Sequence, residues 1–146
     1  VLRQMVDLFA EYHCSIVAIE EVPMDQTQNY GVIDGHEIQD GVFQVSDMVE
    51  KPAPEDAPTN MAIIGRYILT PDIFDILRNT PPGRGGEIQI TDAIASQAKS
   101  RRVLAYRFKG RRFDCGSVGG FIEATNFVYD TQFAERTASS TNAAAG

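Results

Sequence analysis

The sequence is poor in the residues that build disulfide frameworks and zinc centres. Only two cysteines occur among its 146 residues, Cys14 and Cys115, and neither belongs to a CxxC pair or to another metal-ligand spacing. Small secreted domains stapled by disulfides contain more cysteines than this. The two histidines, His13 and His36, have no partner pattern, so a zinc site and a Cys–His nucleophile are both disfavoured. This cysteine usage is typical of a reducing compartment, and we expect a cytoplasmic protein.

Long hydrophobic runs and an excess of positive charge are also absent. No apolar stretch approaches the roughly 20 residues that a membrane-spanning helix needs, and we expect no membrane association. The 13 Lys and Arg residues are outnumbered by 20 Asp and Glu residues, and the net charge of −7 disfavours a general binder of nucleic acids or anionic membranes. The basic residues of one acid-free stretch are interpreted as a solvated helix end and strand, not as a nucleic-acid patch: Lys99, Arg101, Arg102, Arg107, Lys109, Arg111 and Arg112.

The sequence does contain regular apolar patterns, and 43% of its residues are hydrophobic, which excludes disorder for most of the chain. Apolar residues at helical spacing predict an amphipathic helix over residues 1–12, and a β-branched run predicts a buried strand over 15–22. Turn signals at Asp34-Gly35 and Asp40-Gly41 predict a β-meander. It is expected to end at Lys51, because the proline that follows cannot donate to a ladder.

The remainder of the chain alternates between strand and helix signals. Apolar runs predict strands over residues 61–70 and 103–108. Residues that favour helix N-caps predict further helices that begin at Thr70, at Thr91 or Asp92, and at Ser117. Together these signals predict an α/β domain over residues 1–136, with a mixed β-sheet and flanking helices, followed by a frayed tail over residues 137–146.

Two candidate binding sites lie at the ends of the predicted meander. Gly31 enters the meander in the motif Tyr30-Gly31-Val32, where the absence of a Cβ lets a ligand approach the backbone, although a simple bulge glycine is favoured on spacing alone. Glu50 and Lys51 leave the meander. A carboxylate can accept hydrogen bonds from sugar hydroxyls and an ammonium can neutralise phosphate oxygens, but on this pair alone a solvated strand end is favoured.

Two further candidates lie in loops. The segment 113–117 is predicted to place Asp114 after a strand and before a glycine turn and the Ser117 cap, where a lone carboxylate suits Mg²⁺. An Asp that simply caps the turn is an equal alternative. Glu87 follows Gly85 and Gly86, whose spacing matches neither a Walker loop nor a dinucleotide fingerprint, and a flexible loop entering a helix is favoured there.

The order of these motifs is more specific than any of them alone. The sequence YGV, VEKP, GRYIL, GGEIQITDA and FDCGS resembles the bacterial UTP–glucose-1-phosphate uridylyltransferases, and more loosely the wider sugar-nucleotidyltransferase superfamily. The similarity extends from about residue 1 to 135. It implies the C-terminal portion of a Rossmann-like nucleotidyltransferase fold. It also implies an Mg²⁺-dependent reaction in which UTP and glucose 1-phosphate give UDP-glucose and pyrophosphate.

The resemblance also implies roles for individual residues. Gly31 would contact the glucose through its backbone, and Glu50 would accept hydrogen bonds from sugar hydroxyls. Lys51 would bind the sugar-linked phosphate and act in catalysis. Asp114, in the family's F-D-x-G segment, would be one of two carboxylates that hold Mg²⁺. Two more residues are implied to line the sugar pocket: Gly65 of GRYIL and Glu87 of GGEIQ.

The family's glycine-rich GxGTR loop, which holds the nucleotide, does not occur in this sequence. We therefore expect about the C-terminal half of such an enzyme, inactive by itself, with an open sheet edge. The intact enzyme would be a homo-oligomer. Two alternatives are a non-catalytic module that binds sugar phosphates or UDP-sugars, and a nucleotidyltransferase for another sugar or nucleotide.

Overall fold

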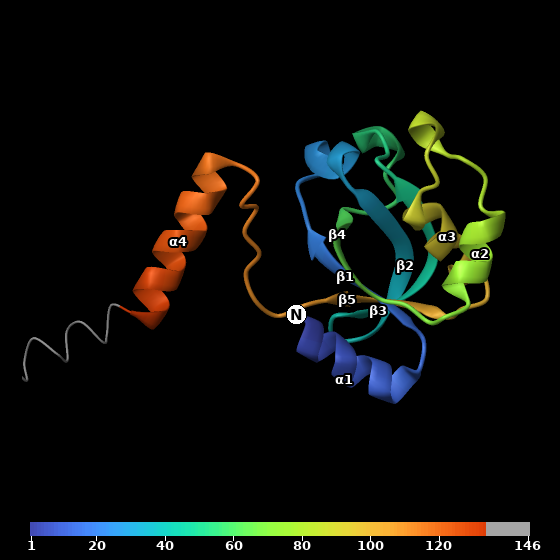
Figure 1. The fold of residues 1–146 in the computed structure, drawn as a ribbon, viewed down its shortest axis with the longest axis horizontal. Coiled ribbons are helices and arrows are strands. Elements are labelled where there is room, and N and C mark those ends of the chain that lie inside the picture. The colour runs from blue at the N-terminus through green and yellow to red at the C-terminus, as the bar shows by residue number, and fades with distance from the viewer. Residues whose placement is uncertain (134–146) are drawn as a thin grey trace, which may run out of the picture. The chain divides into compact units, whose positions relative to one another are not determined.

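The computed structural model describes residues 1–133 and divides the chain into two compact units, one from Val1 to Lys109 and one that begins at Gly110. The predicted tail, 137–146, lies outside the described residues. In the first unit (Figure 1) the elements are α1 (Leu2–Tyr12), β1 (Ser15–Glu21), η1 (Met24–Asn29), β2 (Gly31–Gln39), β3 (Val42–Glu50), η2 (Pro54–Asp56), β4 (Met61–Ile68), α2 (Ile73–Asn79), η3 (Arg84–Gly86), α3 (Ile90–Ala98) and β5 (Val103–Arg107). The second unit contains α4 (Val118–Gln132).

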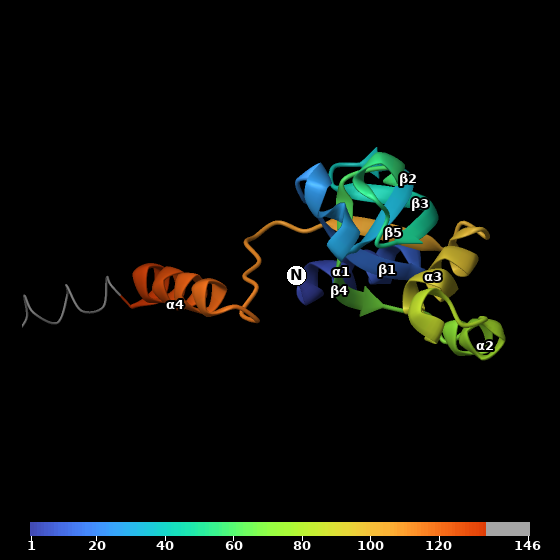
Figure 2. The ribbon, with the colours of Figure 1, turned by 90° about the horizontal axis from the view of Figure 1, so that it is seen from above.

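The five strands of the first unit form one mixed sheet, as predicted. Their order is β1-β4-β2-β3-β5, and the sheet closes into a barrel because β5 pairs with both β3 and β1 (Figures 1 and 2). The β1–β5 pair is parallel and the other pairs are antiparallel. The prediction of an open sheet edge is therefore wrong for the described strands, because each of them pairs with a neighbour on both sides. Closure between β2 and β4 rests on a single paired position, Val32 opposite Ala62.

Strand β1 is buried on both faces, which explains its continuous apolar sequence. Val17 and Ile19 belong to one core cluster, which α2 and α3 cover with Ile73 and Ile94 among others. Their neighbours along the strand, Ile16 and Ala18, point the other way into a second cluster beneath α1, formed with Met5, Leu8, Val42, Leu104 and Phe108. The sheet is thus covered by α1 on one side and by α2 and α3 on the other.

The two Asp-Gly dipeptides of the meander have different structures. Asp40-Gly41 forms the predicted turn between β2 and β3, and Gly41 has a positive φ of 74°. The turn predicted at Asp34-Gly35 is wrong, because β2 continues through it with a shift of register against β3. A Cβ on Gly35 would lie 2.4 Å from the Gln44 carbonyl oxygen. The glycine therefore serves close contact between two paired strands.

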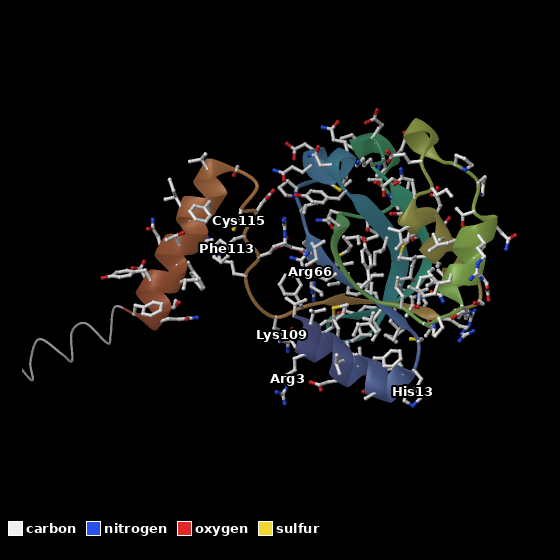
Figure 3. All side chains as sticks on the ribbon, viewed as in Figure 1. Arg3, His13, Arg66, Lys109, Phe113 and Cys115 are labelled. Carbon is white, nitrogen blue, oxygen red and sulfur yellow. The ribbon has the colours of Figure 1, made fainter. Side chains whose placement is uncertain are left out.

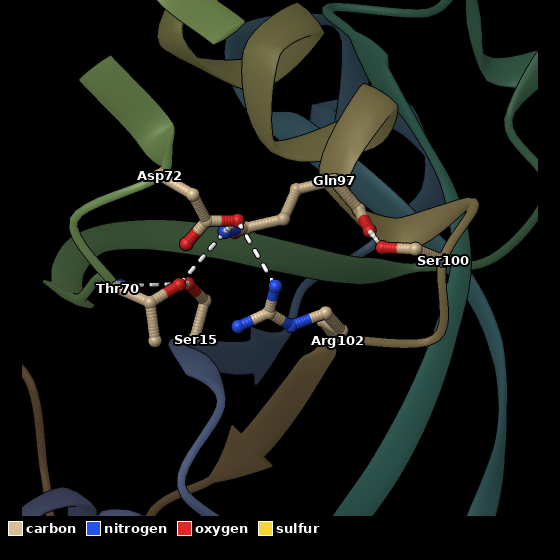
Figure 4. Close-up of polar contacts among 6 residues, drawn as sticks. All are labelled: Ser15, Thr70, Asp72, Gln97, Ser100 and Arg102. Atoms are coloured by element: carbon tan, nitrogen blue, oxygen red, sulfur yellow. Dashed lines mark hydrogen bonds and ion pairs between the residues drawn. The ribbon is translucent and has the colours of Figure 1, made fainter. Parts of the chain in front are cut away.

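Two of the predicted helix caps are also wrong. Helix α2 begins after Asp72 and α3 after Gln89, and neither residue caps its helix with a side-chain hydrogen bond. The hydroxyl of Thr70 is buried instead in a polar cluster with Ser15 and Gln97 (Figure 4). The third cap is confirmed, since the Ser117 Oγ accepts a hydrogen bond from the Gly120 amide.

The second unit is built around α4 and the segment that precedes it. Arg111 lies over the rings of Phe113 and Phe127, 4.9 and 5.4 Å from their centroids, and forms an ion pair with Glu123. Figure 3 shows Phe113 and Cys115 on the segment that leads into α4. The strand predicted before Asp114 is absent from the described residues, because β5 ends at Arg107. No described helix has the length and apolar character that a membrane span requires.

Candidate functional site

Gly31 and Glu50 lie opposite each other where β2 begins and β3 ends. A Cβ built on Gly31 would lie 3.1 Å from Glu50 Oε2, 3.2 Å from Thr91 Oγ1 and 3.3 Å from Ile63 Cδ1. These contacts are tight on three sides. Gly31 is buried, so a glycine at this position lets the Glu50 carboxylate and the Thr91 hydroxyl pack directly against the backbone of β2.

The Glu50 carboxylate is held by a side chain from α3. Thr91 Oγ1 donates a hydrogen bond of 2.7 Å to Glu50 Oε2, and Thr91 is only 5% exposed. The Glu50 side chain is itself 18% exposed. Burial raises the pKa of Tyr67 on β4, and the negative charge of Glu50 raises it further. The carboxylate thus occupies a sheltered position bordered by β2, β4 and α3.

Lys51 turns back toward this carboxylate. Successive residues of a strand point to opposite faces, but Lys51 has a left-handed φ of 47°, which ends the strand. Its amide donates to the Tyr30 carbonyl at 3.0 Å, and its Nζ lies 3.8 Å from Glu50 Oε1. The Lys51 side chain is 50% exposed. A non-glycine residue in this conformation costs about 1–3 kcal/mol, and His13 and Arg101 adopt a similar one.

The structure brings Gly31, Glu50 and Lys51 together, whereas Gly65 and Glu87 of the same unit have other surroundings. Gly65 lies in an irregular part of β4 with a φ of 69°, and a Cβ there would have no neighbour within 4 Å. Glu87 is exposed in the loop before α3, where its carbonyl accepts a hydrogen bond from the Gly83 amide. Among the described contacts, none joins either residue to the Glu50 carboxylate.

Asp114 belongs to the second unit and is exposed. Its Oδ1 accepts a hydrogen bond of 3.0 Å from the Gly116 amide, and α4 approaches it so closely that a Cβ on Gly120 would lie 1.9 Å from its carbonyl oxygen. The described residues contain no group of three or more acidic, histidine or cysteine side chains that could hold a metal ion. Asp114 can offer one carboxylate ligand, and a hard cation such as Mg²⁺ takes one or two protein carboxylates and completes its shell with water or phosphate oxygens.

Most residues of the basic stretch 99–112 that have a described ion pair contact acidic residues of the first unit. Arg107 contacts Glu21 and Glu37, Lys109 contacts Asp40, and Arg102 contacts Asp72. These pairs tie strand β5 and its flanks to neighbouring acidic residues. Both cysteines are free, and burial raises the pKa of the Cys14 thiol.

Residues 1–131 match the nucleotidyl transferase family over most of the chain. The chain belongs to this family. A UTP–glucose-1-phosphate uridylyltransferase of Pseudomonas aeruginosa is 63% identical over 133 residues, which cover 91% of this chain and 48% of the relative. One from Streptococcus pneumoniae is 49% identical over 124 residues, covering 84% of this chain and 42% of the relative. This nucleotidyl transferase chain therefore spans about half the length of the curated relatives that it matches.

A solved structure supports the same assignment. The crystal structure of a UDP-glucose pyrophosphorylase complexed with UDP-glucose matches 90% of this chain and 50% of its own with a TM-score of 0.84, at 59% sequence identity. The predicted fold class, an α/β nucleotidyltransferase fold with a mixed sheet, is confirmed by this likeness and by the family match.

Sequence reasoning missed the role of Thr91, which was interpreted as one of two candidate helix caps. A signal was present nevertheless. Ile94, Ala95 and Ala98 follow Thr91 by three, four and seven residues, so Thr91 lies on the apolar face of its helix. A hydroxyl at a buried position needs a hydrogen-bond partner, and here the partner is Glu50.

Proposed function

We propose that this chain supplies the sugar-phosphate side of a uridylyl transfer, in which UTP and glucose 1-phosphate give UDP-glucose and pyrophosphate. The observation that carries the proposal is the arrangement of Glu50, which is held by Thr91 against the backbone of Gly31 and lies directly beside Lys51. The names of the relatives, UTP–glucose-1-phosphate uridylyltransferase, support the same reaction.

The chemistry needs no protein nucleophile. An oxygen of the glucose 1-phosphate forms a bond to the α-phosphorus of UTP, and the bond from that phosphorus to pyrophosphate breaks. Both reactants are polyanions, so the protein must align them and screen their repulsion. In this proposal Glu50 accepts hydrogen bonds from sugar hydroxyls, the Gly31 backbone approaches the sugar, and the Lys51 ammonium neutralises the sugar-linked phosphate. Gly65 and Glu87 would line the outer part of the sugar pocket.

A magnesium ion belongs to the same proposal, with Asp114 as one of its ligands. When bound, the ion would neutralise phosphate charge. Asp114 suits this role because it is exposed and its turn is fixed by its own hydrogen bond to Gly116. We further propose a cytoplasmic location, supported by the two free cysteines, and a homo-oligomeric state for the intact enzyme.

The proposal is tested in a chimeric enzyme in which this chain replaces the segment that it matches in the Pseudomonas aeruginosa relative. Pyrophosphate release is measured with UTP, glucose 1-phosphate and Mg²⁺. Lys51→Ala is expected to lower kcat/KM by about 10²- to 10³-fold, the usual cost of losing one positioned electrostatic group. Lys99→Ala, at an exposed lysine at the end of α3, is the matched control and is expected to leave turnover unchanged. Near-normal turnover of Lys51→Ala would refute the role of Lys51.

A second candidate follows from the length of the chain relative to its family. Because the chain spans about half of its relatives, it could serve as a non-catalytic module that binds UDP-sugars. Calorimetry of the 146-residue chain with UDP-glucose and Mg²⁺ separates the two candidates. Binding by the chain with an inactive chimera favours the module. A panel of sugar phosphates and nucleoside triphosphates on the active chimera decides the third alternative, another sugar or another nucleotide.

A further inference from the structure

We infer that Thr91 is a positioning residue that fixes the Glu50 carboxylate for contact with the sugar. The inference rests on the proposed function, because it concerns the same site. The 2.7 Å hydrogen bond from Thr91 Oγ1 engages Glu50 Oε2. Glu50 Oε1 remains directed toward Lys51, whose Nζ lies 3.8 Å away. The two oxygens of one carboxylate are therefore differentiated by their surroundings.

Thr91 can act in this way because α3 is anchored along its length. Ala93, Ile94 and Ala98 lie in the main core cluster. Toward the other end of the helix, Gln97 is 2% exposed, and its Nε2 donates to Thr70 Oγ1 at 2.8 Å and to Asp72 Oδ2 at 3.0 Å. A helix held in the core and at its polar end cannot shift easily. The hydroxyl of Thr91, a β-branched residue with restricted χ1, is consequently presented at a fixed point.

The effect on Glu50 is a loss of rotational freedom before the ligand arrives. The terminal torsion of a glutamate is broad, so an unrestrained carboxylate samples many orientations. A carboxylate has about four acceptor positions, and Thr91 occupies one of them while leaving the others for sugar hydroxyls. Ordering a flexible side chain on binding weakens affinity by about 3- to 10-fold, and the hydrogen bond from Thr91 removes this loss in advance.

The surroundings of Thr91 show that its hydroxyl is directed at Glu50 and not at its own helix. A Cβ on Gly31 would come within 3.2 Å of Thr91 Oγ1 and 3.1 Å of Glu50 Oε2. Gly31 therefore allows the hydrogen-bonded pair to pack directly against the backbone of β2, and a larger residue there would displace it. A hydroxyl that served only helix stability would be expected to bind backbone at the helix end, whereas α3 has no side-chain cap and Thr91 reaches across to β3.

The test measures UDP-glucose affinity of the 146-residue chain by calorimetry in the presence of Mg²⁺. Thr91→Val keeps the shape of the side chain and removes the hydroxyl, and it is expected to weaken binding about 3- to 10-fold. Thr91→Ser restores the hydroxyl and is expected to recover most of the affinity. Ser96→Ala removes an exposed hydroxyl from the same helix and is expected to leave affinity unchanged. Thr91→Ala replaces the valine variant if that variant loses its fold.

A double-mutant cycle separates positioning from general structural damage. In a Glu50→Gln background, Thr91→Val is expected to cause no further loss, because its effect acts through the carboxylate. An equal additional loss in that background would overturn the inference, and so would wild-type affinity in Thr91→Val. If Glu50→Gln alone leaves affinity unchanged, the proposed sugar site fails and the inference with it. If the wild-type chain does not bind at millimolar ligand, the same variants are compared in the chimera by their KM for glucose 1-phosphate, with the same expected pattern. If Glu50→Gln weakens UDP-glucose binding and Thr91→Val does not, the sugar site stands and only the inference about Thr91 is overturned.

Discussion

The polar cluster between the start of β1, the β4–α2 connection and α3 gives a quantitative prediction for stability. Thr70 is buried at its centre (Figure 4). Its hydroxyl forms a hydrogen bond of 3.2 Å with Ser15 Oγ and accepts one of 2.8 Å from Gln97 Nε2. Thr70→Val removes both interactions with almost no change in volume. The substitution therefore isolates the hydrogen bonds from any cavity effect.

The expected loss of stability depends on which hydrogen bonds the partners of Thr70 retain after the substitution. A hydrogen bond contributes about 1 kcal/mol net, and a buried polar group left unpaired costs about 1–3 kcal/mol. Gln97 retains its hydrogen bond to Asp72, and Ser15 Oγ retains the hydrogen bond from the Thr70 amide. Neither partner is left without any hydrogen bond. Thr70→Val also removes the hydrogen bond from Thr70 to Asp72, so we expect it to lower the free energy of unfolding by about 2–3 kcal/mol, the sum of three lost interactions.

Urea denaturation followed by circular dichroism measures this loss. Thr80→Val is the matched control, because the Thr80 hydroxyl donates only to the Ile76 carbonyl of its own helix. Its substitution is expected to cost less than about 0.5 kcal/mol. The reasoning is refuted if the two variants unfold at the same urea concentration, or if Thr70→Val unfolds together with the wild type. A changed slope of the transition would show that the denatured state, and not the cluster, had changed.

Three other predictions follow from particular contacts. Hydrogen bonds from Thr70 and Gln97 lower the pKa of Asp72 below its ordinary value of 3.8, so its contribution to stability is present above that value and is lost as pH falls through the lower folded-state pKa. Urea titrations at several acid pH values should show this decline, and Asp72→Asn should flatten it. Gly35→Ala should destabilise the chain by about 1–3 kcal/mol, measured by the same denaturation. Gly120→Ala, which would drive a methyl group into the Asp114 backbone, should reduce the helix content of α4 by circular dichroism.

Strand prediction succeeded where both faces of the strand have the same apolar environment. Strand β1 is buried on both faces, so its β-branched apolar sequence admits only one interpretation. Ser117 was assigned correctly for a related reason, because the partner of its hydroxyl is the amide of Gly120, three residues away. In both cases the information that determines the structure lies within the segment itself.

The failed predictions share the opposite property. Asp34-Gly35 and Asp40-Gly41 have the same turn propensity, and pairing with β3 decides between them. Thr70 and Thr91 both satisfy the local requirements of a helix cap, but their partners are distant in sequence. Thr70 binds Ser15, 55 residues away, and Thr91 binds Glu50, 41 residues away. Local propensity cannot include such contacts, so sequence reasoning identified Glu50 as a candidate but not the residue that holds it.

Helix α3 has a polar contact toward each end, and we expect the two contacts to contribute to different properties. Helix α3 is joined to Glu50 near its start through Thr91 and to Thr70 near its end through Gln97. The core contacts of Ile94 lie between these two connections. Thr70→Val acts at the Gln97 end and leaves the Thr91 hydroxyl beside its carboxylate, so we expect it to lower the free energy of unfolding without changing affinity. Thr91→Val also removes a hydrogen bond of a buried residue, so we expect it to lower the free energy of unfolding and, in addition, the affinity for UDP-glucose. Affinity therefore distinguishes the two substitutions, although both remove one threonine hydroxyl from a buried contact of α3.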